Sequence, residues 1–180
     1  MAKVETLAPF IMSWEKGYND HKNDFPTKWG VTLPTWRAYG WDKNGDGKID
    51  KEDIKLLTEK DSTYILKKRY WDIWKADYIR DQSVANLLVD WYWNSGTKAI
   101  TLTQKILGVS ADGKVGNKTL ESINSWTGVH LFTLIWARRK KFIQGLKNYD
   151  EVGAGLMRRL QSIQYHKLIC NDTKKTEVNF

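Results

Sequence analysis

The sequence has one cysteine, three prolines and no long apolar run, and each of these features excludes a class of protein. A single cysteine, Cys170, cannot form an internal disulfide framework. The longest apolar stretch, around residues 129–137, is about half as long as a membrane-spanning helix requires. Three prolines and 13 glycines in 180 residues are too few for a fibrous or low-complexity chain. The N-terminus has no basic cluster before an apolar stretch, so we expect no secretory signal peptide.

The composition instead predicts a folded domain, or one domain with a small companion lobe. Hydrophobic residues make up 41% of the chain and charged residues 28%, which is enough apolar material for a core. Ten tryptophans and eight tyrosines are unusually many. These rings either fill the core or offer flat faces on which sugar rings stack, and composition alone does not separate the two interpretations.

The net charge of +8 is confined to the second half of the chain. Residues 1–90 hold equal numbers of basic and acidic side chains, whereas residues 91–180 are strongly basic. The residues 138–141 and the pair Arg158 and Arg159 supply much of this charge. Such a surface would suit a polyanion, either a nucleic acid, a membrane surface or an acidic cell-wall polymer. A surface that is merely solvated explains the same excess.

Apolar periodicity predicts an almost entirely helical chain. Residues 18–32 carry Asn, Asp, Pro and Gly between short β-prone pieces, so we expect a loop or small hairpin there. Thr32 is placed to cap the helix that follows it. The final ten residues are expected to form a loose tail. The predicted helices span residues 4–16, 32–39, 51–76, 84–94, 100–107, 118–123, 129–146 and 156–169.

Residues 42–53 read DKNGDGKIDKED and match the twelve-residue calcium loop of the EF-hand type. Gly47 falls where the loop needs a sharp turn, and Asp53 stands at the closing position, where most such loops carry Glu. A single loop favours a structural Ca²⁺ ion over a calcium sensor, and an acidic turn without an ion is the alternative. The predicted ligands are Asp42, Asn44, Asp46, Lys48 through its carbonyl, Asp50 and Asp53.

Carboxylates are the best candidates for catalysis, because the sequence has no nucleophile elbow and no histidine pair with zinc spacing. Glycoside hydrolysis needs a carboxylic acid and usually a second carboxylate. Glu15 falls in the last turn of the first predicted helix, where the helix dipole disfavours an anion. A side chain in a locally unfavourable place often has a function. Asp20 and Asp24 follow in the next turn and are candidates for the second carboxylate.

Several motifs resemble glycosyl hydrolase family 108, which comprises lysozyme-like N-acetylmuramidases of phage endolysins and bacterial prophages. The first is Glu15-Lys16-Gly17-Tyr18, followed by Asn19-Asp20, Asp24, Thr27 and Trp29-Gly30-Val31-Thr32. Lys68-Arg69-Tyr70-Trp71 and Trp91-Tyr92-Trp93-Asn94-Ser95-Gly96 resemble two later helices of the family. Leu107-Gly108-Val109, Asp112-Gly113, Val115-Gly116 and Lys118-Thr119-Leu120 resemble its peptidoglycan-binding lobe. Lys16 and Phe25-Pro26 stand where the family has glycines, and the calcium loop is an insertion.

The resemblance implies a mainly α, lysozyme-like fold with a small β-hairpin and one EF-hand-type loop. Glu15 then falls on the catalytic acid, which sites of this type hold at a helix end against apolar groups, where it stays protonated. Asp24 falls on the second carboxylate that positions water or stabilises the cation. Thr27 or Thr32 would orient water. The candidates for sugar contacts are Tyr18, Trp29, Tyr92 and Asn94.

The implied reaction is hydrolysis of the β-1,4 bond between N-acetylmuramic acid and N-acetylglucosamine in bacterial peptidoglycan. We expect a catalytic lobe over residues 1–96 and a basic peptidoglycan-binding lobe over 97–180, packed as one globule in a monomer. The protein would be made in the cytoplasm and reach the wall by holin-type or unconventional release. The main alternative is a non-catalytic wall-binding or secretion-accessory protein with the same fold. A calcium-dependent interaction module or a nucleic-acid binder ranks below both.

Overall fold

The computed structural model describes residues 1–15, 17–20 and 25–180 and is mainly helical. The helices are α1 (Val4–Trp14), α2 (Leu33–Tyr39), α3 (Lys51–Leu56), α4 (Glu59–Ile65), the π-helix η1 (Leu66–Trp71), the 3-10 helix η2 (Ala76–Tyr78), α5 (Gln82–Ser95), α6 (Thr97–Leu107), α7 (Asn117–Ser125), α8 (Gly128–Gln144) and α9 (Tyr149–Gln161). The strands are β1 (Thr27–Lys28), β2 (Val31–Thr32), β3 (Ile163–Gln164), β4 (Lys167–Ile169) and β5 (Glu177–Asn179).

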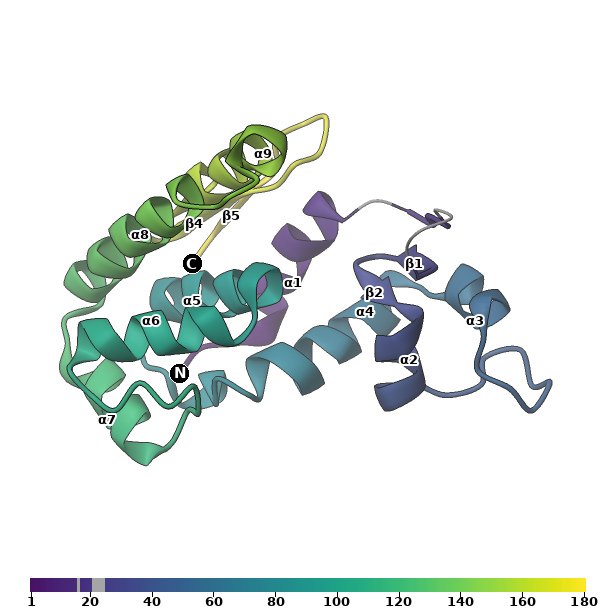
Figure 1. Ribbon diagram of the computed structural model, residues 1–180, viewed down its shortest axis with the longest axis horizontal. Helices are drawn as coiled ribbons and strands as arrows, with labels where there is room; N and C mark the ends of the chain where they lie inside the picture. The colour runs from purple at the N-terminus through teal and green to yellow at the C-terminus, as the bar shows by residue number, and fades with distance from the viewer. Residues whose placement is uncertain (16, 21–24) are drawn as a thin grey trace.

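The buried apolar side chains form two clusters, and these define a large and a small lobe. The large lobe is built around α5, which is buried on almost every side from Ser83 to Trp91 and packs against α6 and α8. The small lobe contains β1, β2, α2, α3 and α4, and its core includes Val31, Trp36 and Ile54. Figure 1 shows these elements at one end of the molecule and α6–α8 at the other.

The helical run of α4 and η1 connects the two lobes (Figure 1). Ile65 belongs to the small cluster, whereas its neighbour Leu66 belongs to the large one. Helices on both sides of residue 96 contribute to the large cluster, so the large lobe draws on both of the segments predicted as separate lobes. The predicted boundary at residue 96 stays a prediction. None of the helices in the described ranges is long and apolar enough to cross a membrane.

Side-chain caps mark the starts of α2, α3, α4 and α5. The Thr32 hydroxyl accepts from the Thr35 amide at the start of α2, and the Asp81 carboxylate accepts from the Val84 amide at the start of α5. The stretch predicted as one helix over 51–76 is divided, because Thr58 begins a new helix with a capping box to Asp61. The prediction of one continuous helix there was wrong.

The C-terminal segment differs most from the prediction. The helix expected over 156–169 ends at Gln161, and β3, β4 and β5 form a three-stranded antiparallel sheet. Ile163 and Leu168 pair across β3 and β4 and bury their side chains, and His166 takes the left-handed backbone conformation in the turn between them. The final ten residues are therefore not a loose tail, because β5 pairs with β4 in register.

Candidate active site

Glu15 stands where α1 ends, at the edge of the large lobe. The apolar face of α1 anchors the helix, since Leu7, Phe10 and Ile11 have no exposed surface. Glu15 itself has an extended backbone conformation, and its amide still donates to the carbonyls of the last turn. The side chain of Glu15 is 20% exposed, so its carboxylate is accessible while its backbone is fixed.

Two donors hold the Glu15 carboxylate, and both contact the same oxygen. Oε1 accepts from Nε1 of Trp93 at 2.9 Å and from Nη1 of Arg159 at 3.0 Å. Neither an indole N–H nor a guanidinium can accept a proton at these positions. Oε1 must therefore remain an acceptor, and the oxygen that can carry a proton is Oε2. No donor from the described part of the chain pairs with Oε2.

Arg159 extends this contact into a buried ion-pair network. Its Nε and Nη2 lie 2.9 and 2.8 Å from Oδ1 of Asp90 on α5, and Nη2 of Arg139 on α8 lies 2.7 Å from Oδ2 of Asp90. The side chains of Asp90 and Arg139 are 0% and 1% exposed. Three buried charges from α5, α8 and α9 thus meet beside Glu15 at the end of α1, and removal of Asp90 leaves uncompensated charge in the core.

The electrostatics of the network favour the ionised forms. Burial by itself would raise the pKa of Asp90, but the guanidiniums of Arg159 and Arg139 outweigh it and hold the pKa below its ordinary value. Burial would lower the pKa of Arg159, but Asp90 and Glu15 raise it above its ordinary value. Arg159 is therefore a permanent cation that faces Glu15.

This network corrects the expectation that residues 138–141 and Arg158–Arg159 form one exposed basic surface. Arg139 and Arg159 are buried and bonded to Asp90, so they cannot hold an acidic polymer. Arg158 and Lys140 are exposed. The difference follows from helix geometry, because adjacent residues on a helix point in directions about 100° apart.

The turn between β1 and β2 forms a second wall beside Glu15. Trp29 and Gly30 both adopt positive φ in this turn. A Cβ on Gly30 would lie 2.6 Å from Cζ2 of Trp93 and 2.9 Å from Cδ of Glu15. The turn can therefore approach the carboxylate this closely only with glycine at this position.

A cavity of about 510 Å³ opens beside Glu15. One side comes from α1 and from Trp29, and Glu59 at the start of α4 also reaches it. The C-terminal hairpin supplies the rest, although nothing in the sequence pattern marked it for this role. The lining residues are Pro9, Met12, Ser13, Glu15, Gly17, Trp29, Glu59, Cys170, Asp172, Thr176 and Val178.

The predicted substrate-contacting residues lie in different surroundings. Trp29 lines the cavity with Glu15. The Thr27 hydroxyl donates to the Phe25 carbonyl. The Tyr92 ring meets Tyr70 edge to face.

The remaining predicted residues bond to near neighbours in the sequence. The exposed Tyr18 hydroxyl donates to Oδ2 of Asp20, and the Thr32 hydroxyl caps α2. The Asn94 amide donates to the Asp90 carbonyl within α5. Asp24, the predicted second catalytic carboxylate, lies outside the described residues.

Hydrogen bonds from backbone amides to its own carboxylates hold the predicted calcium loop. Asp42 accepts from the amides of Gly45 and Gly47, and both glycines have positive φ. Asp53 is fully buried and accepts from the amides of Lys43 and Asp50. In the described part of the chain, no three His, Cys, Asp or Glu side chains are grouped so that they could hold a metal ion. Calcium binding stays a prediction.

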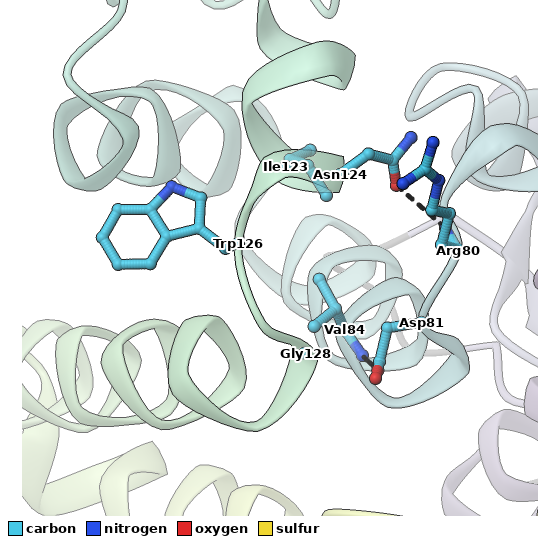
Figure 2. Close-up of a pocket in the computed structure, with 7 residues that line it drawn as sticks. All are labelled: Arg80, Asp81, Val84, Ile123, Asn124, Trp126 and Gly128. Atoms are coloured by element: carbon cyan, nitrogen blue, oxygen red, sulfur yellow. Dashed lines mark hydrogen bonds between the residues drawn. The ribbon is translucent and has the colours of Figure 1, made fainter.

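A second cavity of about 280 Å³ lies at the opposite end of α5 from Trp93. Figure 2 shows Trp126 on one side and Arg80 with Asn124 on the other. The Asn124 side chain bonds the backbone of Arg80 and of Tyr78, and Asp81 accepts from Tyr165 while it caps α5. These polar side chains join α5 to the elements around it, and no predicted site residue lines this cavity.

The chain is similar to known proteins in both sequence and fold. Residues 8–96 match the family model of glycosyl hydrolase 108. The solved structure of SagA from Brucella abortus is similar over 89% of this chain and 90% of its own, with a TM-score of 0.74 and 27% sequence identity. Among curated protein sequences no relative matches significantly. The family resemblance drawn from the sequence is confirmed, and with it the mainly helical fold. Residues 8–96, which include Glu15 and its donor Trp93, form a glycosyl hydrolase 108 domain, the domain of a family of glycoside hydrolases.

Proposed function

We propose that the protein hydrolyses the β-1,4 bond between N-acetylmuramic acid and N-acetylglucosamine in bacterial peptidoglycan. Membership of family 108 suggests lysozyme-like activity on peptidoglycan. The observation that carries the finer proposal is the carboxylate of Glu15, which is fixed through one oxygen beside a cavity of about 510 Å³. A cavity of this size suits one or two sugar rings.

Glu15 acts as the general acid through Oε2. Because Trp93 and Arg159 occupy Oε1, the proton resides on the other oxygen and passes to the glycosidic oxygen as the bond breaks. The leaving sugar departs with its hydroxyl restored. Water adds its hydroxyl to the anomeric carbon of the other sugar, and the proton that the water releases replaces the one that Glu15 gave up. When Glu15 has lost its proton, Arg159 stabilises the carboxylate. Asp24 remains our candidate for the group that directs the water.

Substitution of Glu15 tests this role. We expect Glu15→Gln to abolish lysis of purified walls, because an amide cannot supply the proton, while the Trp93 and Arg159 contacts remain possible. The measurement is wall turbidity, with mass spectrometry of wild-type products to show N-acetylmuramic acid at the new reducing end. Glu5→Gln, an exposed position in the first turn of α1, is the matched control.

Two outcomes would contradict the proposal. Glu15→Gln lysis within tenfold of the wild type would remove Glu15 from the role of acid. A wild-type protein that binds walls but releases no fragments would favour the non-catalytic wall-binding or secretion-accessory alternative.

We also propose that the loop over residues 42–53 binds a structural Ca²⁺ ion. The support is the spacing of its oxygen-bearing side chains and the positive φ of Gly47, which matches the sharp turn of such loops. The Asp42 carboxylate accepts hydrogen bonds from backbone amides of the loop. The ion would therefore bind to a loop that already has its sharp turn.

A melting experiment tests the calcium proposal. An ion that binds only the folded protein adds about 2.7 kcal/mol at a hundredfold excess over its Kd. We expect chelator to lower the Tm by several degrees, and Asp46→Ala to reproduce that loss without recovery in calcium. Identical melting curves with calcium and with chelator would reduce the loop to an acidic turn.

A further inference from the structure

The loop between β4 and β5 lies beside the catalytic end of α1, although more than 150 residues separate them in sequence. The Asn171 amide donates to the Ser13 hydroxyl at 2.9 Å, and Ser13 stands two residues before Glu15. The same hydroxyl donates to the Phe10 carbonyl at 2.7 Å, which fixes its direction. The loop is thus tied to the helix that carries the catalytic acid.

The hairpin itself is internally braced. The Cys170 amide donates to the Thr176 carbonyl at 2.8 Å, and the Thr176 amide donates to Oδ1 of Asp172 at 2.9 Å. Successive side chains of a strand point to opposite faces. Thr176 and Val178 accordingly share the face that lines the Glu15 cavity, whereas Glu177 points away and pairs with Lys167.

The chemistry of this wall suits a sugar. Thr176 and Asp172 are exposed, and they offer a hydroxyl and a carboxylate to the cavity. Hydrogen bonds from Thr176 hold the pKa of Asp172 below its ordinary value, so this carboxylate is an acceptor at neutral pH. The carboxylates of Glu15 and Glu59 line the same cavity as Asp172. Hydrogen-bond donors on the ligand, such as sugar hydroxyls, are therefore favoured.

We propose that the tip of the β4–β5 hairpin is part of the substrate site, where Asp172 and Thr176 bind hydroxyl groups of a sugar ring adjacent to the bond that Glu15 cleaves. This assignment rests on the proposed glycan hydrolysis and extends it to a segment beyond residue 96, where the family match ends. Trp29 also lines this cavity.

The test measures binding apart from turnover. In the full chain with Glu15→Gln, we would titrate a wall tetrasaccharide of alternating N-acetylglucosamine and N-acetylmuramic acid and determine Kd by calorimetry. Adding Asp172→Asn and Thr176→Val should weaken binding about tenfold, since hydrogen bonds to charged groups are the stronger ones. Glu177→Gln is the matched control, on the opposite face of the same strand, and should leave Kd unchanged.

Further variants separate binding from folding. Thr176→Ser retains the hydroxyl, so it should restore the affinity that Thr176→Val loses. In the active enzyme, Thr176→Val should raise KM and leave kcat within twofold.

The outcomes distinguish this inference from the proposed function. A Kd within twofold of the parent for the Asp172→Asn, Thr176→Val protein would overturn the hairpin assignment, whether or not the wild type lyses walls. Tetrasaccharide binding that depends on Thr176, in a wild type that releases no wall fragments, would support the assignment and contradict hydrolysis.

Discussion

The two lobes neutralise their buried carboxylates in different ways. In the small lobe Asp53 accepts hydrogen bonds from two backbone amides of its own loop. Asp61 accepts a hydrogen bond from the Thr58 amide at the start of α4 and forms an ion pair with Lys43. In the large lobe Asp90 is neutralised by Arg139 and by Arg159, which lies 69 residues away in the sequence. The small lobe thus stabilises its buried carboxylates with partners that lie near in the sequence. The large lobe stabilises Asp90 only after three helices have packed together.

This difference has a functional consequence. Because Arg159 is shared between Asp90 and Glu15, the position of the proposed catalytic carboxylate depends on the assembled large lobe. The small lobe contributes a wall through Trp29 and the close approach of Gly30. The large lobe therefore fixes the Glu15 carboxylate, and both lobes shape the cavity beside it.

The largest expected effect follows from breaking the buried network. Asp90→Asn leaves two buried guanidiniums without their carboxylate, so we expect the free energy of unfolding to fall by about 3–5 kcal/mol. Asp61→Asn, the corresponding change in the small lobe, should cost much less because the amides of its cap remain paired. Chemical denaturation of both variants measures the difference. Equal losses would contradict the contrast between the lobes.

A smaller effect is expected where the lobes meet. Gly30→Ala places a methyl group against Trp93 and Glu15 at positive φ, so we expect about 1–3 kcal/mol of strain and a fall in wall lysis. Gly45→Ala is the matched control, because Gly45 also has positive φ but nothing lies within 4 Å of the new methyl. It should lose some stability and keep full activity. Undiminished lysis by Gly30→Ala would show that the turn does not shape the site.

The smallest effect concerns the pH dependence of the small lobe. Burial raises the pKa of Asp61, but hydrogen bonds from Lys43 and Thr58 outweigh it, so the folded-state pKa is lowered. The stabilisation is therefore present above the unfolded pKa of about 3.9 and is lost as the pH falls through the folded value. Asp61→Asn should cost on the order of 1 kcal/mol at pH 7 and depend less on pH below 5. The measurement is the free energy of unfolding of the wild type and of Asp61→Asn as a function of pH. If the two curves run parallel, Asp61 does not contribute to the pH dependence.

Local signals in the sequence were sufficient for much of the fold. The periodicity of the first helix placed Glu15 at its end, and Thr32 marked a helix start that the structure contains. The short strands at the C-terminus were missed, because two or three residues with apolar side chains fit a helix pattern as well as a strand pattern.

The site was only partly predictable. Asp90 carried a signal that was not used, since a lone carboxylate within an otherwise apolar central helix needs a buried partner. That signal would have identified Asp90 as a member of a buried ion pair, but it would not have shown that Arg139 and Arg159 are its partners. No sequence pattern indicated that Asp172 and Thr176 would reach the cavity.

The sequence by itself determined the family, the helical class and the position of Glu15 at the end of a helix, because these depend on motifs and on contacts between near neighbours. Only the tertiary structure decided which cations are buried, which oxygen of Glu15 remains available, and that the C-terminal hairpin walls the cavity. The physical reason is separation along the chain. The contacts that fix these features join residues that meet only after α5, α8, α9 and the C-terminal sheet have packed around α1.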